Sequence, residues 1–164
     1  MESKQQTSKT YFRELSIISN AFFIGILFIG AASFSCSIDE AVVYKKTTSN
    51  FIIMLVVILS NILIVFGSGN VVYKRLVLLR EMTNLREKMA GYKKMIISRM
   101  TFIGLGCVIP LLVFAETGGI GYLILTGFMF FLLGCERPDL ESAIINLKLN
   151  KQEIEILGNP ESII

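Results

Sequence analysis

Histidine is absent from this chain of 164 residues, as is tryptophan, and only three cysteines occur. The lack of histidine removes the commonest side-chain metal ligand and general base. Cys36, Cys107 and Cys135 lie far apart and form no CxxC pair, so neither a zinc site nor a disulfide framework is indicated. The sequence therefore predicts no bound metal and no cofactor.

Charge is also scarce. Charged residues make up 18% of the chain, against about 25% in ordinary soluble domains, while hydrophobic residues make up 53%. The GxSxG, HExxH, P-loop and dinucleotide-binding motifs are all missing. The net charge of +3 is small and no nucleic-acid recognition fold accompanies it. We therefore predict a protein that is not an enzyme and has no nucleic-acid partner.

Long hydrophobic runs are what the chain has instead. The run 51–73 contains twenty-three residues without one charged side chain. As a helix it is about 34 Å long, enough to cross the ~30 Å hydrocarbon layer of a bilayer. Similar uncharged runs occupy about 16–35, 100–115 and 120–135. The sequence predicts one all-α domain over 1–164, an integral membrane four-helix bundle with these four spans.

The first run has a second interpretation. Residues 32–36 loosely resemble the cleavage or lipidation site of a signal peptide. The apolar run is long for such a peptide, and Ser33 stands where a lipidation site usually has leucine. We therefore expect an uncleaved membrane anchor.

A basic stretch over 74–99 separates the second span from the third. Within it, Asn84 precedes Glu87 by three residues, the spacing of a helix cap. Two structures fit: both helices extend beyond the membrane and turn near Asn84, or one amphipathic helix lies on the membrane surface. The cap in mid-stretch favours the extended hairpin. Its apolar residues recur on one helical face: Leu78, Met82, Leu85, Met89, Tyr92 and Ile96.

The C-terminal segment 136–164 is predicted to form a cytoplasmic helical tail. Pro138 is well placed to start a helix, and Asn150 with Glu153 repeats the capping spacing before a last short helix. With four spans, both termini and the 74–99 stretch lie on one side of the membrane. That side holds fourteen of the sixteen Lys and Arg residues, whereas the other side holds Lys45 and Lys46. The positive-inside rule then places both termini in the cytoplasm.

Polar residues inside the spans are the candidate functional positions. No span contains an ionisable residue away from its ends, which argues against proton-coupled transport. Asn20, Ser60, Asn61 and Thr126 remain. Each is a candidate either for lining a permeation path or for an interhelical hydrogen bond worth about 1 kcal/mol. The packing role is the preferred interpretation.

Five cations of the basic stretch are candidate contacts for anionic lipid headgroups: Lys74, Arg75, Lys93, Lys94 and Arg99. Each suitably placed charge contributes about 1 kcal/mol to such binding. The same charges also serve as the topology signal, and the two roles are compatible.

The region 84–149 resembles small four-span bacterial inner-membrane proteins whose activity is uncharacterised. LREKMAGYKKMIISR at 85–99 and ERPDLESAIINLKL at 136–149 carry this resemblance. It implies the four-span layout with a cytoplasmic C-terminal helix, in the inner (plasma) membrane, and it implies no activity.

These observations predict a non-enzymatic membrane protein with the lipid bilayer as its first partner. It is expected to be an accessory or scaffold subunit of a membrane assembly, with other membrane subunits as partners, or a lipid-contacting homo-oligomer. The alternative is a small oligomeric channel or transporter for a small solute, lined by Asn61 and Thr126.

Overall fold

The computed structural model describes residues 7–39, 48–136 and 138–162, and within these ranges it contains helices and no β-strand. Lys4, Lys45, Lys46 and Arg137, which entered the charge count, lie outside the described residues. The helices are α1 (Ser8–Asp39), α2 (Thr48–Glu81), α3 (Leu85–Thr117), α4 (Ile120–Cys135), α5 (Leu140–Leu147) and α6 (Lys151–Gly158).

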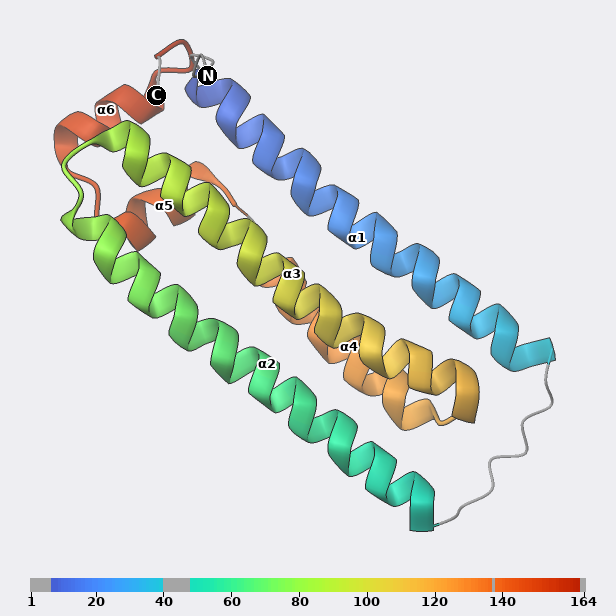
Figure 1. Cartoon of the computed structure of the whole chain (residues 1–164). Helices are drawn as coiled ribbons and strands as arrows, with labels where there is room; N and C mark the ends of the chain where they lie inside the picture. Colours follow the sequence, from blue (N-terminus) through green and yellow to red (C-terminus); the bar gives the residue numbers. More distant parts are fainter. Residues whose placement is uncertain (1–6, 40–47, 137, 163–164) are drawn as a thin grey trace, which may run out of the picture.

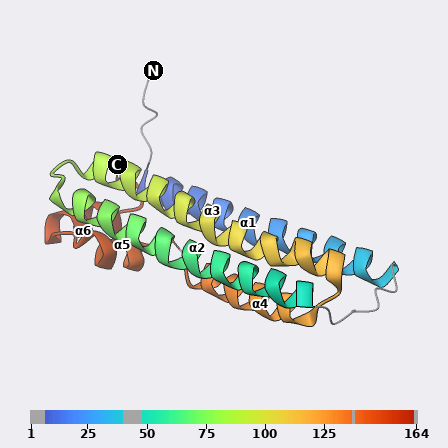
Figure 2. The same cartoon turned by 60° about the horizontal axis from the view of Figure 1, so that its bottom comes forward.

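Helix α3 is the centre of the molecule, because α1, α2 and α4 all pack against it. Figure 1 shows α3 between α1 and α2, and Figure 2 shows α4 beneath it. Small residues permit this crowding. A Cβ atom at Gly106 would lie only 2.9 Å from Oδ1 of Asn61 on α2, so glycine at this position leaves room for the Asn61 side chain between α2 and α3.

The polar parts of the chain gather at one end of this arrangement. The start of α1, the α2–α3 turn, α5 and α6 all lie there, whereas the α3–α4 turn lies at the opposite end (Figure 1). Consequently α1 and α3 run parallel to each other, and α2 and α4 run antiparallel to them. We call the polar end, formed by residues 7–15, 76–96 and 138–162, the head.

The basic stretch forms a helical hairpin, with α2 ending at Glu81 and α3 beginning at Leu85. Asn84 caps α3, since its side chain accepts a hydrogen bond from the backbone N–H of Arg86 at 3.1 Å. This break between the helices shifts the helical phase. The predicted single apolar face is therefore wrong in its first half, because Leu78 is 61% exposed and Met82 is 39% exposed.

Toward its C-terminal end, helix α2 buries a different set of residues: Val72, Leu76 and Leu79. On α3 the predicted face is correct, and Met89, Tyr92 and Ile96 are buried while Leu85 is half-buried. The hydroxyl of Tyr11 on α1 donates to the carbonyl of Met89 at 2.7 Å, which ties α1 to the same core.

Two glycines make the turn between α3 and α4. Gly118 adopts a left-handed conformation with φ of 64°, and its N–H donates to the carbonyl of Phe114 at 2.8 Å. This is the helix-ending geometry that favours glycine. Gly119 then precedes α4, and this short connection makes the two helices antiparallel neighbours.

Helix α4 is short and ends in a sharp bend: its axis and that of α5 differ by 83°. Pro138 does not begin α5. Asp139 is the capping residue and α5 begins at Leu140, because the Asp139 carboxylate satisfies the backbone N–H of Ser142 at 2.7 Å. At α6 the predicted spacing yields a complete capping box between Asn150 and Glu153.

Within the described ranges, three helices are long and apolar enough to cross a membrane: α1, α2 and α3. A fourth is counted when α4 and α5 are taken together as one bent span. Helix α4 by itself has 16 residues, about 24 Å at 1.5 Å per residue. Over the residues that the structure describes, the protein is thus all-helical with three or four candidate spans, consistent with a multi-pass membrane protein.

Candidate functional site

Asn61 is the most deeply buried of the four polar residues predicted inside the spans. It is 3% exposed, and its Nδ2 donates to the carbonyl of Val57 on its own helix at 3.0 Å. Its Oδ1 is buried with no hydrogen-bond partner in the part of the chain that the structure describes, and it faces Gly106 on α3. An amide oxygen left unpaired in an apolar interior is costly, so this position has a spare acceptor between α2 and α3.

The two hydroxyl groups of the predicted set are satisfied within their own helices. Ser60 donates to the carbonyl of Val57 at 2.8 Å, and Thr126 donates to that of Tyr122 at 2.9 Å. Such bonds to the preceding turn let a hydroxyl sit in an apolar environment at low cost. Asn20 is different, since it is exposed and lies beside the bend between α4 and α5.

Two of the five predicted headgroup cations are engaged in ion pairs. Lys93 Nζ lies 2.6 Å from a carboxylate oxygen of Glu14, and Arg99 Nη2 lies 2.6 Å from one of Glu136. The other three predicted cations, Lys74, Arg75 and Lys94, are exposed.

A buried ion pair in the head was not predicted from the sequence. Lys88 Nζ lies 2.6 Å from Oε1 of Glu153, and their side chains are 5% and 11% exposed. Burial raises the pKa of the Glu153 carboxyl. The hydrogen bonds from Lys88 and from the backbone N–H of Asn150, together with the Lys88 charge, outweigh burial and hold that pKa below its ordinary value.

Further hydrogen bonds join α1 to α6 and the hairpin to α5. The hydroxyl of Ser8 donates to the carbonyl of Leu157 at 2.7 Å, so α1 begins against α6. Arg80 Nε donates to the carbonyl of Asn146 at 2.8 Å, which joins α2 to α5. Because these partners lie far apart in sequence, no local pattern could have identified them.

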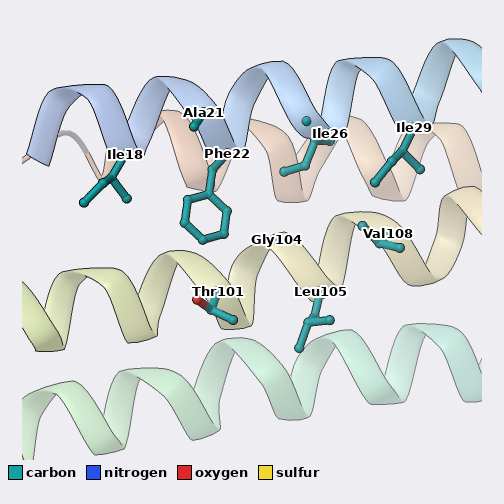
Figure 3. A pocket seen from close by; sticks show the side chains of 10 residues that line it. Ile18, Ala21, Phe22, Ile26, Ile29, Thr101, Gly104, Leu105 and Val108 are labelled. Carbon is teal, nitrogen blue, oxygen red and sulfur yellow. The ribbon is translucent and has the colours of Figure 1, made fainter. Parts of the chain in front are cut away.

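Two cavities flank α1. The first is an apolar groove of about 470 Å³ between α1 and α3. Figure 3 shows Phe22 of α1 pointing toward α3 beside Gly104, with Ala21 on α1 adding to the small residues along the groove. The second is a polar cavity of about 450 Å³ between α1 and the α4–α5 bend.

No group of three or more Cys, Asp or Glu side chains that could hold a metal ion occurs within the described ranges, and the sequence contains no histidine. The described cysteines are free thiols, Cys107 buried and Cys135 exposed, while the side chain of Cys36 lies outside the described residues. No protein-family model, curated protein or solved structure matches the chain. The described part of the chain therefore belongs to the class of all-helical proteins, with three or four apolar helices that could span a membrane.

Proposed function

We propose that the protein is a multi-pass protein of a bacterial inner (plasma) membrane that works without catalysis. In this proposal it is an accessory or scaffold subunit of a membrane assembly, or a lipid-contacting homo-oligomer. The observation that carries the proposal is its apolar outer surface: Phe28, Leu63, Phe66, Ile124 and Phe131 are between 67% and 75% exposed. Lipid tails or apolar helices are the surroundings that such a surface favours.

The charges indicate where the hydrocarbon layer would lie. The Arg99–Glu136 ion pair marks one boundary, and the exposed Glu116 beside the α3–α4 turn marks the other. Residues 100–115 between them span about 24 Å as a helix, somewhat less than the ~30 Å of a typical bilayer. A modest local thinning of the bilayer accommodates this difference.

The head lies beyond the Arg99 boundary and carries most of the described Lys and Arg residues, so the positive-inside rule places it in the cytoplasm. Lys74, Arg75 and Lys94 then lie just outside the hydrocarbon, at a depth suited to anionic headgroups. Each such contact contributes about 1 kcal/mol.

Reporter fusions test this topology. A fluorescent protein that matures only in the cytoplasm should fluoresce when fused before Met1 or after Ile164. A periplasm-dependent phosphatase fused after Gly119 in a truncated chain should be active, because that turn lies at the other end. Phosphatase activity after Ile164, or recovery of the intact protein without detergent, contradicts the proposal.

Purification in mild detergent tests the subunit role. Unrelated chains that co-purify in a fixed ratio support an accessory subunit, and a defined homo-oligomer that retains lipid supports the lipid-contacting form. A monomer that carries neither protein nor lipid contradicts both forms.

A small channel or transporter is the second candidate, and the unpaired Oδ1 of Asn61 is the observation that favours it. In that case Asn61 and Thr126 contribute to a path through an oligomer. Asn61→Leu separates the two functions. For a packing residue the substitution changes the free energy of unfolding by about 1 kcal/mol, whereas for a path-lining residue it changes solute flux in liposomes at unchanged stability.

A further inference from the structure

The polar cavity beside α1 exists because α4 is short. Helix α4 ends at Cys135 and the chain bends by 83° into α5, which leaves space between the bend and α1. The space has a volume of about 450 Å³, within the usual range for small-molecule sites. Its lining is mixed: Ser16, Ser19, Asn20, Phe23, Pro138 and Asp139.

The cavity lies at the depth of the proposed membrane boundary. Glu14 of α1 pairs with Lys93 of α3, and further along the two parallel helices Phe22 lies beside Gly104. Asn20, between Glu14 and Phe22, therefore lies near the level of Arg99, which follows Lys93 on α3. This is the level of the Arg99–Glu136 pair, where lipid headgroups meet the hydrocarbon.

The lining offers one full charge and several neutral hydrogen-bonding groups. Among the described residues that line the cavity, Asp139 is the charged one. Hydrogen bonds from the side chain and backbone of Ser142 lower the pKa of the Asp139 carboxyl below its ordinary value, which favours its charged form. The hydroxyls of Ser16 and Ser19 and the amide of Asn20 can donate hydrogen bonds to an anionic oxygen.

We propose that this cavity binds the headgroup of phosphatidylethanolamine, with the ammonium group donating to the Asp139 carboxylate and the phosphate accepting from Ser16, Ser19 and Asn20. A primary ammonium is a compact cation with three N–H donors, which a choline headgroup lacks. Phe23 and Pro138 provide apolar surface for the headgroup's methylene groups. This inference rests on the proposed membrane placement.

Competition between lipids tests the site on the wild-type protein. The protein is reconstituted into vesicles of equal parts phosphatidylethanolamine, phosphatidylcholine and phosphatidylglycerol, extracted in mild detergent, and the retained lipids are counted by native mass spectrometry. We expect phosphatidylethanolamine to be retained over phosphatidylcholine by about tenfold, the factor that one well-placed hydrogen bond supplies. Equal retention, or preferential retention of phosphatidylglycerol, overturns the proposal.

A matched pair of variants locates the binding. Asp139→Asn removes the charge but keeps a good helix-capping residue, so α5 is expected to stay folded. It should lower phosphatidylethanolamine retention about tenfold. Glu141→Gln removes a neighbouring exposed carboxylate that does not line the cavity and should leave retention unchanged.

Equal retention by Asp139→Asn and wild type, or equal losses from the two variants, refutes the site. These results leave the membrane topology intact, because that is tested by the reporter fusions. If Asp139→Asn fails to fold, the wild-type competition still decides the question.

Discussion

The buried ion pair of Lys88 and Glu153 joins α6 to the N-terminal end of α3. Removal of the pair should destabilise the head. The perturbations are Lys88→Met and Glu153→Gln, alone and together. Methionine is unbranched like lysine and keeps most of its length, and glutamine keeps an oxygen that can complete the capping box with Asn150. Both single variants therefore remove a charge while they preserve most of the packing.

The expected magnitude follows from the burial of the pair. With side chains 5% and 11% exposed, the loss of one partner leaves the other charge in a nearly dry site. Such losses cost about 3–5 kcal/mol of unfolding free energy, whereas replacement of both charged groups costs much less than the sum. The exposed pair of Lys93 and Glu14 is the control, since Lys93→Met should cost less than about 1 kcal/mol.

Acidification should weaken the pair in a defined direction. The pKa of the Glu153 carboxyl in the folded protein lies below its ordinary value of 4.5. Its stabilising contribution is therefore complete above pH 4.5 and is lost as the pH falls through the folded-state pKa. In the Lys88→Met variant this loss should shrink, because the main group that lowers the pKa is gone.

The free energy of unfolding is measured by titration with SDS in mixed micelles. The thiol of Cys107, which is fully buried, reports unfolding through its reaction with a maleimide dye, in a background with Cys36 and Cys135 replaced by serine. A Lys88→Met cost no larger than that of Lys93→Met, or a double variant equal to the sum of the singles, refutes the reasoning.

Two further outcomes follow from the packing. Gly106→Ala should cost about 1–3 kcal/mol of unfolding free energy in the same titration, because a Cβ there would crowd α2 and α4. The control Gly127→Ala should cost nothing, since no heavy atom lies within 4 Å of the added Cβ. Equal costs from the two variants would contradict the close packing of α3. In folded protein, the exposed Cys135 should react with a small membrane-permeant maleimide while Cys107 stays unmodified, as mass spectrometry of the two peptides would show. Rapid labelling of Cys107 would contradict its burial.

The helices and most of their ends could be predicted from local chemistry. Runs of uncharged residues specify long helices, since lipid leaves the backbone no other partners than its own. Gly118 ends α3 because a left-handed residue is needed there, and Asn84 caps α3 because its side chain accepts a hydrogen bond from a backbone N–H of the first turn. These features depend on residues a few positions apart.

The candidate polar residues could also be identified from the sequence, because they interrupt apolar runs. Their surroundings in the folded protein could not. That Asn61 would stand out in an apolar run follows from composition alone. The position of its Oδ1 against Gly106 depends on how α2 packs on α3. The position of Asn20 beside a cavity at the α4–α5 bend depends in the same way on how α1 and α4 pack on α3.

By itself the sequence determined an all-helical chain with apolar runs of spanning length and its cations near their ends. The tertiary structure alone decided that Lys88 would meet Glu153, that Leu78 would be exposed, and that a polar cavity would open beside Asp139. The physical reason is range: hydrophobicity, caps and turns act between near neighbours in the chain. Ion pairs, buried faces and cavities arise only when segments distant in sequence pack together.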